Sequence, residues 1–247
     1  MNPNKIIDLK VLFMLKLTNK LFYTQIITVG NYGVGKSSIL KRFHQVDLDD
    51  NTTGFKTKKF IIDNHHVSVQ TWDTSGQERF CSLSSSFYRN CDGVILCFSV
   101  DNEDSFKALD LWRDELIKFG YFPDRVPFIL VGNKFDLEFK KHVINSKMAQ
   151  DWCKYQKLKY QVGVNKELPD IIYHETSIEK LVSIDEAFIN ICRQAFENKI
   201  KISLSKLNNN NNNNEENNNN NNNNENNNYN NVPIFQIGQK IRSCCYY

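Results

Sequence analysis

The chain alternates between short apolar runs and longer segments in which apolar residues recur every three or four positions. The apolar runs are typical of buried strands, and two runs that alternate with period two around Asn64-His65 indicate an antiparallel hairpin. The expected strands are 22–29, 56–63, 66–72, 93–100, 126–132 and 171–177, and the expected helices are 38–43, 104–119, 148–158 and 184–200. Strands that alternate with helices predict a doubly wound α/β sheet, mostly parallel, with its ligand at the carboxyl ends of the strands.

Composition divides the chain into three parts. Residues 208–231 contain 20 asparagines among 24 residues, so this tract has almost nothing apolar to bury and is expected to be disordered. We therefore expect an N-terminal extension over 1–21, one folded domain over 22–203 and a disordered, asparagine-rich tail over 204–247. The net charge of +3 is too small to indicate a nucleic-acid partner. Seven cysteines without a C-x-x-C pair favour the reduced thiols of a cytosolic protein over a disulfide framework.

The N-terminal extension contains an apolar and basic run, residues 6–17. Asp8, Lys10 and Lys16 interrupt this run, which is too short and too charged to span a bilayer. No small-residue cleavage site follows it, which argues against a signal peptide. Two interpretations stay open, an extra helix packed on the domain and a helix that lies on a membrane surface.

A glycine-rich turn joins the first expected strand to the first expected helix. Residues 30–37 read Gly-Asn-Tyr-Gly-Val-Gly-Lys-Ser and match the pattern G-x-x-x-x-G-K-[ST]. Glycines let consecutive backbone N–H groups point at phosphate oxygens, and the helix N-terminus adds its dipole. Lys36 is expected at the β- and γ-phosphates, and Ser37 offers a hydroxyl to Mg²⁺.

A second motif, Asp73-Thr74-Ser75-Gly76, ends the second strand of the hairpin. A carboxylate followed by a bendable glycine suits a second magnesium position beside a γ-phosphate. Asp73 is expected to hold the metal, the Gly76 N–H to touch the γ-phosphate, and Gln77 to orient a water as the catalytic residue. The expected phosphate-binding residues are thus Gly30, Gly33, Val34, Gly35, Lys36, Ser37, Ser38 and Gly76.

The motif N-K-x-D occupies residues 133–136, after the strand expected at 126–132. The Asp136 carboxylate can accept two hydrogen bonds from guanine, whereas adenine offers neither donor and would leave this carboxylate unpaired. Asn133 is expected to tie this loop to the phosphate loop, and the stem of Lys134 to lie along the base. The expected guanine-binding residues are Asn133, Lys134, Asp136, Ser177 and Ile178.

With these motifs in place, residues 22–200 resemble the Ras-like small GTPases and, within them, the Rab branch. The most Rab-like stretches are 72–80 (WDTSGQERF), 87–89 (FYR) and 175–177 (ETS). The resemblance implies a P-loop NTPase fold, α/β, with a six-stranded, mostly parallel sheet flanked by about five helices. It also implies a GTPase with a slow intrinsic rate, in which Mg²⁺-bound GTP orders two switch loops and hydrolysis to GDP releases them.

The resemblance further implies a lipid anchor. Cys244-Cys245 resembles the prenylated paired-cysteine ending of Rab proteins, and 232–237 resembles the apolar segment that engages the prenylation escort. Two ordinary tail cysteines are the alternative. The partners implied are an exchange factor, a GTPase-activating protein, the prenylation escort, a GDP-dissociation inhibitor and effectors. The implied place is the cytoplasmic face of a membrane, with cycling through the cytosol and a role in vesicle trafficking.

Two departures from the family pattern bear on activity. The first switch, between Phe43 and Phe55, is shorter than is usual, and Thr52 is expected to coordinate the metal because 52–54 matches T-x-G. Tyr32 stands in the phosphate loop where relatives carry a small residue. The expected metal ligands are Ser37, Thr52 and Asp73. These departures favour an alternative, a membrane-tethered nucleotide-binding module that recruits partners with little or no hydrolysis. A P-loop kinase is less favoured, because it leaves N-K-x-D unexplained.

Overall fold

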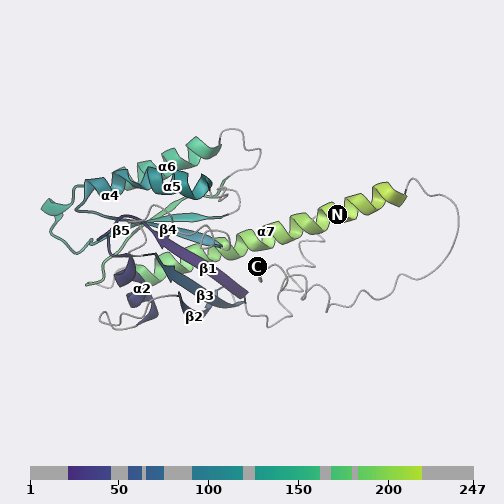
Figure 1. Ribbon diagram of the computed structural model, residues 1–247, viewed down its shortest axis with the longest axis horizontal. Coiled ribbons are helices and arrows are strands. Elements are labelled where there is room, and N and C mark those ends of the chain that lie inside the picture. Colours follow the sequence, from purple (N-terminus) through teal and green to yellow (C-terminus); the bar gives the residue numbers. More distant parts are fainter. Residues whose placement is uncertain are drawn as a thin grey trace. The chain divides into compact units, whose positions relative to one another are not determined.

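A six-stranded sheet with the order β2-β3-β1-β4-β5-β6 forms the centre of the computed structural model (Figure 1). The strands are β1 (Phe22–Val29), β2 (Phe55–Ile62), β3 (His65–Asp73), β4 (Gly93–Ser99), β5 (Phe128–Asn133) and β6 (Ile172–Glu175). The helices are α2 (Lys36–His44), α4 (Glu103–Lys107), α5 (Leu109–Lys118), α6 (Ser146–Gln161) and α7 (Ile184–Asn218), with a 3-10 turn over Phe139–Lys141. The structure describes residues 22–45, 55–62, 65–74, 91–118, 126–161, 168–179 and 183–218, and the side chains of α7 as far as Ile202.

The sheet is parallel except at one edge. β1 pairs in parallel with both β3 and β4, and β5 pairs in parallel with β4 and β6, whereas β2 is antiparallel to β3. The predicted six-stranded, mostly parallel α/β fold is therefore confirmed. In this order the carboxyl ends of five strands point to the same end of the sheet, and Thr28 of β1 is level with Asp73, the last residue of β3.

Helices cover both faces of the sheet, with α2 and α7 on one face and α4, α5 and α6 on the other (Figure 1). Each face has its own apolar cluster. In the first, the rings of Phe43 of α2 and Phe188 of α7 stack with their centroids 3.9 Å apart, and both side chains are fully buried. All seven residues of β4 and all six of β5 are buried, as expected for central strands covered on both sides.

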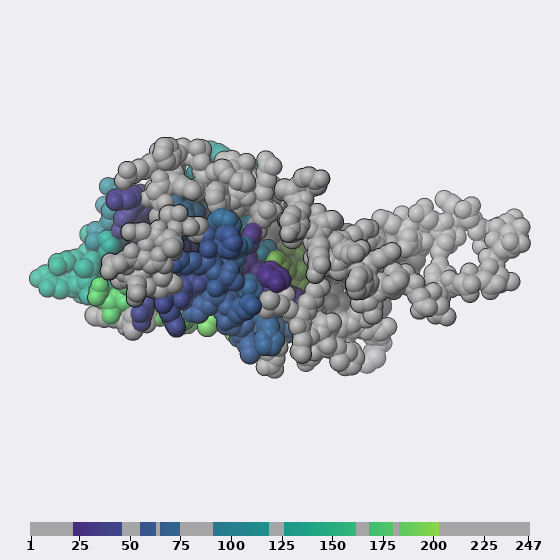
Figure 2. All heavy atoms as spheres, turned by 60° about the horizontal axis from the view of Figure 1, so that its bottom comes forward, coloured from purple at the N-terminus to yellow at the C-terminus, as the bar shows by residue number. Residues whose placement is uncertain are grey.

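The hairpin of β2 and β3 lies on the face turned forward in Figure 2, in blue. Along β2, exposed and half-buried residues alternate, as the period-two pattern predicted. Phe55 at the start of this edge strand is 54% exposed, and its ring centroid lies 5.1 Å from that of Trp72. The edge also carries Lys56, Lys58 and Lys59, the type of residue that discourages unwanted strand pairing.

Two helices differ from the expectation. The helix expected over 104–119 is divided into α4 and α5 at Ala108, although the N–H of Ala108 and that of Trp112 still make helical hydrogen bonds across the junction. The last helix was expected to end at Ile200, but α7 continues to Asn218. Lengthening a helix adds one hydrogen bond per residue without a new nucleation step, so a well-packed helix can continue into a sequence that would not begin one. Residues 219–247 lie outside the described residues, and the domain boundaries remain a prediction.

We expect Phe188→Ala to lower the free energy of unfolding by about 3–5 kcal/mol, because it removes one ring of the buried stack and leaves a cavity. Urea unfolding at saturating GDP measures this change. Ile189→Ala is the matched control on the same helix, since that side chain is 36% exposed and its loss should cost far less. Equal losses for the two variants would contradict the packing described here.

Candidate nucleotide-binding site

The loop between β1 and α2 contains three glycines with positive φ, Gly30 at 149°, Gly33 at 79° and Gly35 at 95°. A Cβ at Gly30 would lie 2.1 Å from the carbonyl oxygen of Cys97 in β4, and a Cβ at Gly35 would lie 2.2 Å from Nδ2 of Asn133 in β5. Glycine is thus required at both positions by conformation and by space. The loop therefore rests directly on the carboxyl ends of the two central strands, where the ligand was expected.

Lys36 folds back under this loop. Its side chain is 2% exposed, and its Nζ donates hydrogen bonds to the backbone carbonyls of Gly30 and Asn31, both at 2.8 Å. The ammonium is therefore held in place by the loop itself. A positive charge fixed beneath a ring of backbone groups, at the N-terminus of α2, is an arrangement that suits an anionic ligand.

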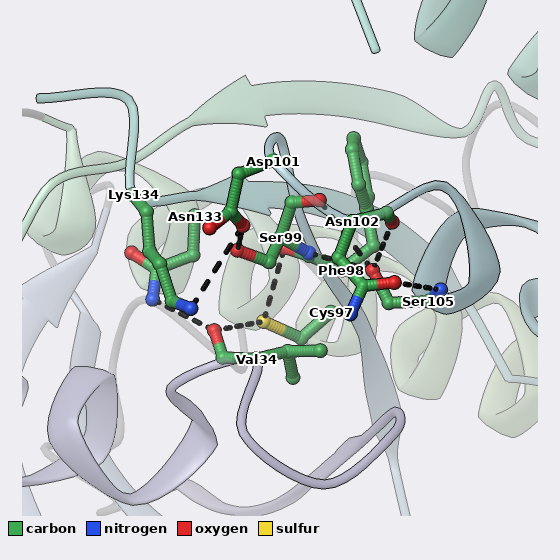
Figure 3. A network of polar contacts seen from close by, with 9 residues as sticks. All are labelled: Val34, Cys97, Phe98, Ser99, Asp101, Asn102, Ser105, Asn133 and Lys134. Carbon is green, nitrogen blue, oxygen red and sulfur yellow. Dashed lines mark hydrogen bonds and ion pairs between the residues drawn. The ribbon is translucent and has the colours of Figure 1, made fainter. Parts of the chain in front are cut away.

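Asn133, the last residue of β5, connects the phosphate loop to the loop that follows β6. Its contact with Val34 is drawn in Figure 3. Its side chain is fully buried, and its Nδ2 donates to the carbonyl of Val34 at 2.9 Å. Its Oδ1 accepts a hydrogen bond from the Thr176 hydroxyl at 3.3 Å. The tie between N-K-x-D and the phosphate loop, which the sequence predicted, is present in the structure.

The carbonyl of Val34 has a second neighbour that the sequence did not indicate, the thiol of Cys97 at 4.0 Å (Figure 3). Burial raises the pKa of Cys97 to about 12, so the thiol stays neutral and can act as a weak donor. Nothing in the local sequence distinguishes this cysteine from the other apolar residues of β4. Its position follows from the pairing of β4 beside β1.

The loop after β5 and the loop after β6 are joined by hydrogen bonds. The Ser177 hydroxyl donates to a carboxylate oxygen of Asp136 at 2.7 Å, and the Phe135 N–H donates to the carbonyl of Thr176 at 3.1 Å. The Thr176 N–H in turn donates to the carbonyl of Gly132 at 2.8 Å. The structure therefore brings Asp136 and Ser177 together, with Ile178 next to Ser177 in the chain, and their assignment to guanine remains a prediction.

Lys134 has a positive φ of 64°, which is uncommon for a residue with a side chain. Its ammonium lies 3.8 Å from the carboxylate of Asp101, which also accepts a hydrogen bond from the Ser99 hydroxyl (Figure 3). The sequence did not predict this contact with Asp101. Lys134 and Asp101 are each about one third exposed, at 38% and 33%, so the pair is weak and serves to orient the lysine.

Two of the expected metal ligands, Ser37 and Asp73, are within the described residues. Ser37 is the second residue of α2, and Asp73 ends β3. The next residue, Thr74, donates its hydroxyl to the carbonyl of Thr28 at 2.6 Å and fixes the end of β3 against β1. A hydroxyl and a carboxylate are oxygen ligands of the type that Mg²⁺ prefers. Among the described residues no group of three or more His, Cys, Asp or Glu side chains could hold a metal ion.

The remaining expected site residues, Thr52, Gly76, Gln77, Cys244 and Cys245, lie outside the described residues.

Comparison with known proteins agrees with the motifs and the fold. The family model described as "Ras family" matches residues 25–197. The chain is 94% identical to Ras-related protein RabP of Dictyostelium discoideum over 247 residues, which is all of both chains. It is 37% identical to Ras-related protein Rab-7a of the same organism over 187 residues, 73% of this chain and 86% of the relative. With the Ypt/Rab-type GTPase ypt7 of Schizosaccharomyces pombe the identity is 36% over 181 residues, 70% and 82% of the two chains.

The chain is a Rab-family small GTPase. It therefore binds guanine nucleotides and belongs to a family of enzymes that hydrolyse GTP. Rab proteins as a family act through regulators and effectors and are generally associated with membranes. The glycine-rich loop, the buried Lys36 and the hydrogen-bonded loops after β5 and β6 lie at the end of the sheet where the motifs predicted the nucleotide site.

We expect Gly35→Ala to weaken GDP binding at least about tenfold more than Gly33→Ala, because the new Cβ would displace the amide of Asn133 and leave the buried carbonyl of Val34 without that donor. Alanine at Gly33 meets a similarly unfavourable φ but no atom within 4 Å, which makes it the matched control. Isothermal titration of the nucleotide-free proteins with GDP measures the difference. Similar losses for both variants would show that backbone strain alone decides the outcome.

Proposed function

We propose that this Rab GTPase is a lipid-anchored switch that alternates between GTP- and GDP-bound states and regulates a step of vesicle trafficking. The observation that carries the proposal is the phosphate loop, in which the buried Lys36 and the Asn133 bridge are already in place. A site whose ligating groups are fixed before the ligand arrives loses little freedom on binding, and this favours tight nucleotide binding. Tight binding is what a switch needs, since each nucleotide must persist until a regulator acts.

In this proposal the phosphate loop, from Gly30 to Ser38, holds the phosphates, with Lys36 at the β- and γ-phosphates. Asp136 selects guanine, because an adenine base would leave its carboxylate without the two donors that guanine supplies. Asn133, Lys134, Ser177 and Ile178 complete the guanine pocket. Mg²⁺, when bound, neutralises charge on the β- and γ-phosphates, and the residues that would hold it are Ser37, Thr52 and Asp73. Gln77 would orient the attacking water, with the Gly76 N–H at the γ-phosphate.

The proposed membrane attachment relies on lipid. No helix in the part of the chain that the structure describes is long and apolar enough to cross a bilayer. Prenyl groups on Cys244 and Cys245 would supply the affinity, since each buried CH₂ contributes about 0.8 kcal/mol and two chains anchor a protein stably. The prenylation escort and a GDP-dissociation inhibitor are the partners that such an anchor requires. An exchange factor and a GTPase-activating protein would drive the cycle, and effectors would read the GTP state.

One observation favours a second candidate, a nucleotide-binding module that recruits partners with little hydrolysis. Tyr32 projects from the phosphate loop with 69% of its surface exposed. A large ring at this position can obstruct the approach of an arginine finger, which supplies most of the rate in stimulated hydrolysis. The two candidates differ in one measurable quantity, the rate of GTP hydrolysis.

We expect Gln77→Leu to lower the intrinsic hydrolysis rate, itself on the order of 10⁻⁴ s⁻¹, because leucine cannot orient the attacking water. Single-turnover hydrolysis of bound GTP, with and without Mg²⁺, measures the rate. Gln70→Leu in β3 is the control, because this glutamine bonds to the side chain of Gln25 within the sheet. If the rate is the same in the wild type and in Gln77→Leu, the chain is the non-cycling module and not the switch.

We expect the double substitution Cys244→Ser/Cys245→Ser to move the protein from membranes to the cytosol, with each single variant intermediate. Membrane flotation of a tagged full-length chain from cells measures the distribution. GDP affinity serves as the control and should stay unchanged, because neither cysteine belongs to a motif assigned to the nucleotide. A double variant that stays on membranes contradicts the lipid anchor. It would make the apolar run 6–17 the candidate, to be tested by deleting residues 1–20.

A further inference from the structure

We propose that Trp112 of α5 is a positioning residue for the phosphate loop. Its indole Nε1–H donates a hydrogen bond to the side-chain oxygen of Asn31 at 2.9 Å, between residues that are 81 positions apart in the sequence. Asn31 is one of two residues, with Gly30, whose backbone carbonyls accept the Lys36 ammonium at 2.8 Å. A single loop residue is thus held from α5 through its side chain and holds the lysine through its main chain.

The helix that carries Trp112 is fixed to α6 on one side. The carboxylate of Asp110 accepts a hydrogen bond from the indole Nε1–H of Trp152 at 3.0 Å and another from the amide of Gln156. Asp110 precedes Trp112 by two residues, so the backbone that places the tryptophan is held by α6. A donor on such a support keeps its direction, which is the condition for a group that positions another.

The other anchor of the helix is Arg113, the next residue. Its guanidinium lies between the rings of Phe128 in β5 and Tyr160 in α6, 4.8 and 4.7 Å from the two centroids, and the residue is 1% exposed. Stacking of this kind fixes a planar cation between two surfaces. Trp112 therefore projects from a helix that is anchored to both the sheet and α6.

The hydrogen bond from Trp112 should raise the affinity for nucleotides that carry more than one phosphate. Without the indole N–H, the side chain of Asn31 loses a fixed donor, and the backbone carbonyl that holds Lys36 becomes less constrained. Nucleotide binding must then order this carbonyl, and the ordering lowers the affinity. This reasoning rests on the proposed role of Lys36 at the β- and γ-phosphates. It predicts an effect on GDP and GTP and none on GMP, which carries a single phosphate.

The test compares Trp112→Phe with Trp152→Phe by isothermal titration with GDP and with GMP. Both substitutions keep an aromatic ring and remove an indole N–H from the layer of α5 and α6, but only Trp112 bonds to the loop. Loss of one hydrogen bond should weaken GDP binding about fivefold in Trp112→Phe and leave GMP binding unchanged. Trp152→Phe should leave GMP binding unchanged and weaken GDP binding less than Trp112→Phe does, because Gln156 and Arg113 still hold α5 in place. Equal losses of GDP and GMP affinity in Trp112→Phe would mean a general loosening of the domain and would overturn the proposal.

Asn31 offers a second approach should the tryptophan variants fail to fold. Asn31→Ala should weaken GDP binding by the same factor, and the double variant with Trp112→Phe should be no weaker than either single one. Additive losses in the double variant would show that the two residues act independently, which overturns the proposal.

Lys36→Ala separates this inference from the function on which it rests. If Lys36→Ala keeps the GDP affinity of the wild type, the role of Lys36 at the phosphates is wrong and the proposed site fails with it. If Lys36→Ala abolishes GDP binding while Trp112→Phe and Asn31→Ala change nothing, the proposed site stands and only the positioning role of Trp112 is wrong.

Discussion

The nucleotide site depends on one buried hydrogen bond, from the amide of Asn133 to the carbonyl of Val34. It joins the loop after β1 to the loop after β5, and neither partner can turn to water, because Asn133 is fully buried and Val34 is 1% exposed. A buried polar group that loses its partner costs about 1–3 kcal/mol, so the bond strongly favours one relative position of the two loops. Gly35 is what makes room for it.

Lys36 adds a constraint of a different kind. A buried ammonium is unfavourable unless polar groups compensate for the water it has lost, and the carbonyls of Gly30 and Asn31 are two of the groups that do so. In the proposed function a bound phosphate would add an opposite charge beside this ammonium. A nucleotide that binds the folded domain and not the unfolded chain would also raise the stability of the domain. Lys36 and the loops joined by Asn133 lie at the same end of the sheet, at the carboxyl ends of its parallel strands.

The sequence predicted all six strands, because their apolar runs and the period-two hairpin are local signals. It also predicted the meeting of Asn133 with the phosphate loop, because each motif ends a strand and parallel strands end at the same side of the sheet. Asp136 and Ser177 were both assigned to guanine, but their direct hydrogen bond was not predicted. It did not predict the end of α7, because asparagine is a weak helix former and the periodic apolar pattern stops at Ile200, whereas a helix already formed by packing can extend further. The contacts of Cys97 with Val34 and of Trp112 with Asn31 were also missed, because they join residues 63 and 81 positions apart through side chains that no motif marks.

The contrast between contacts that motifs predict and contacts that no motif marks has a physical cause that applies to Rab proteins in general. The groups that would touch nucleotide come from short motifs, and a motif can be recognised because the chemistry of phosphate and guanine allows few alternatives. The groups that hold the motifs in place come from elsewhere, as Cys97, Asp101 and Trp112 do here, and many residue types could support a loop equally well. Two members of the family can therefore share every motif residue and still differ in nucleotide affinity, since affinity depends on how firmly the motifs are held before the ligand binds.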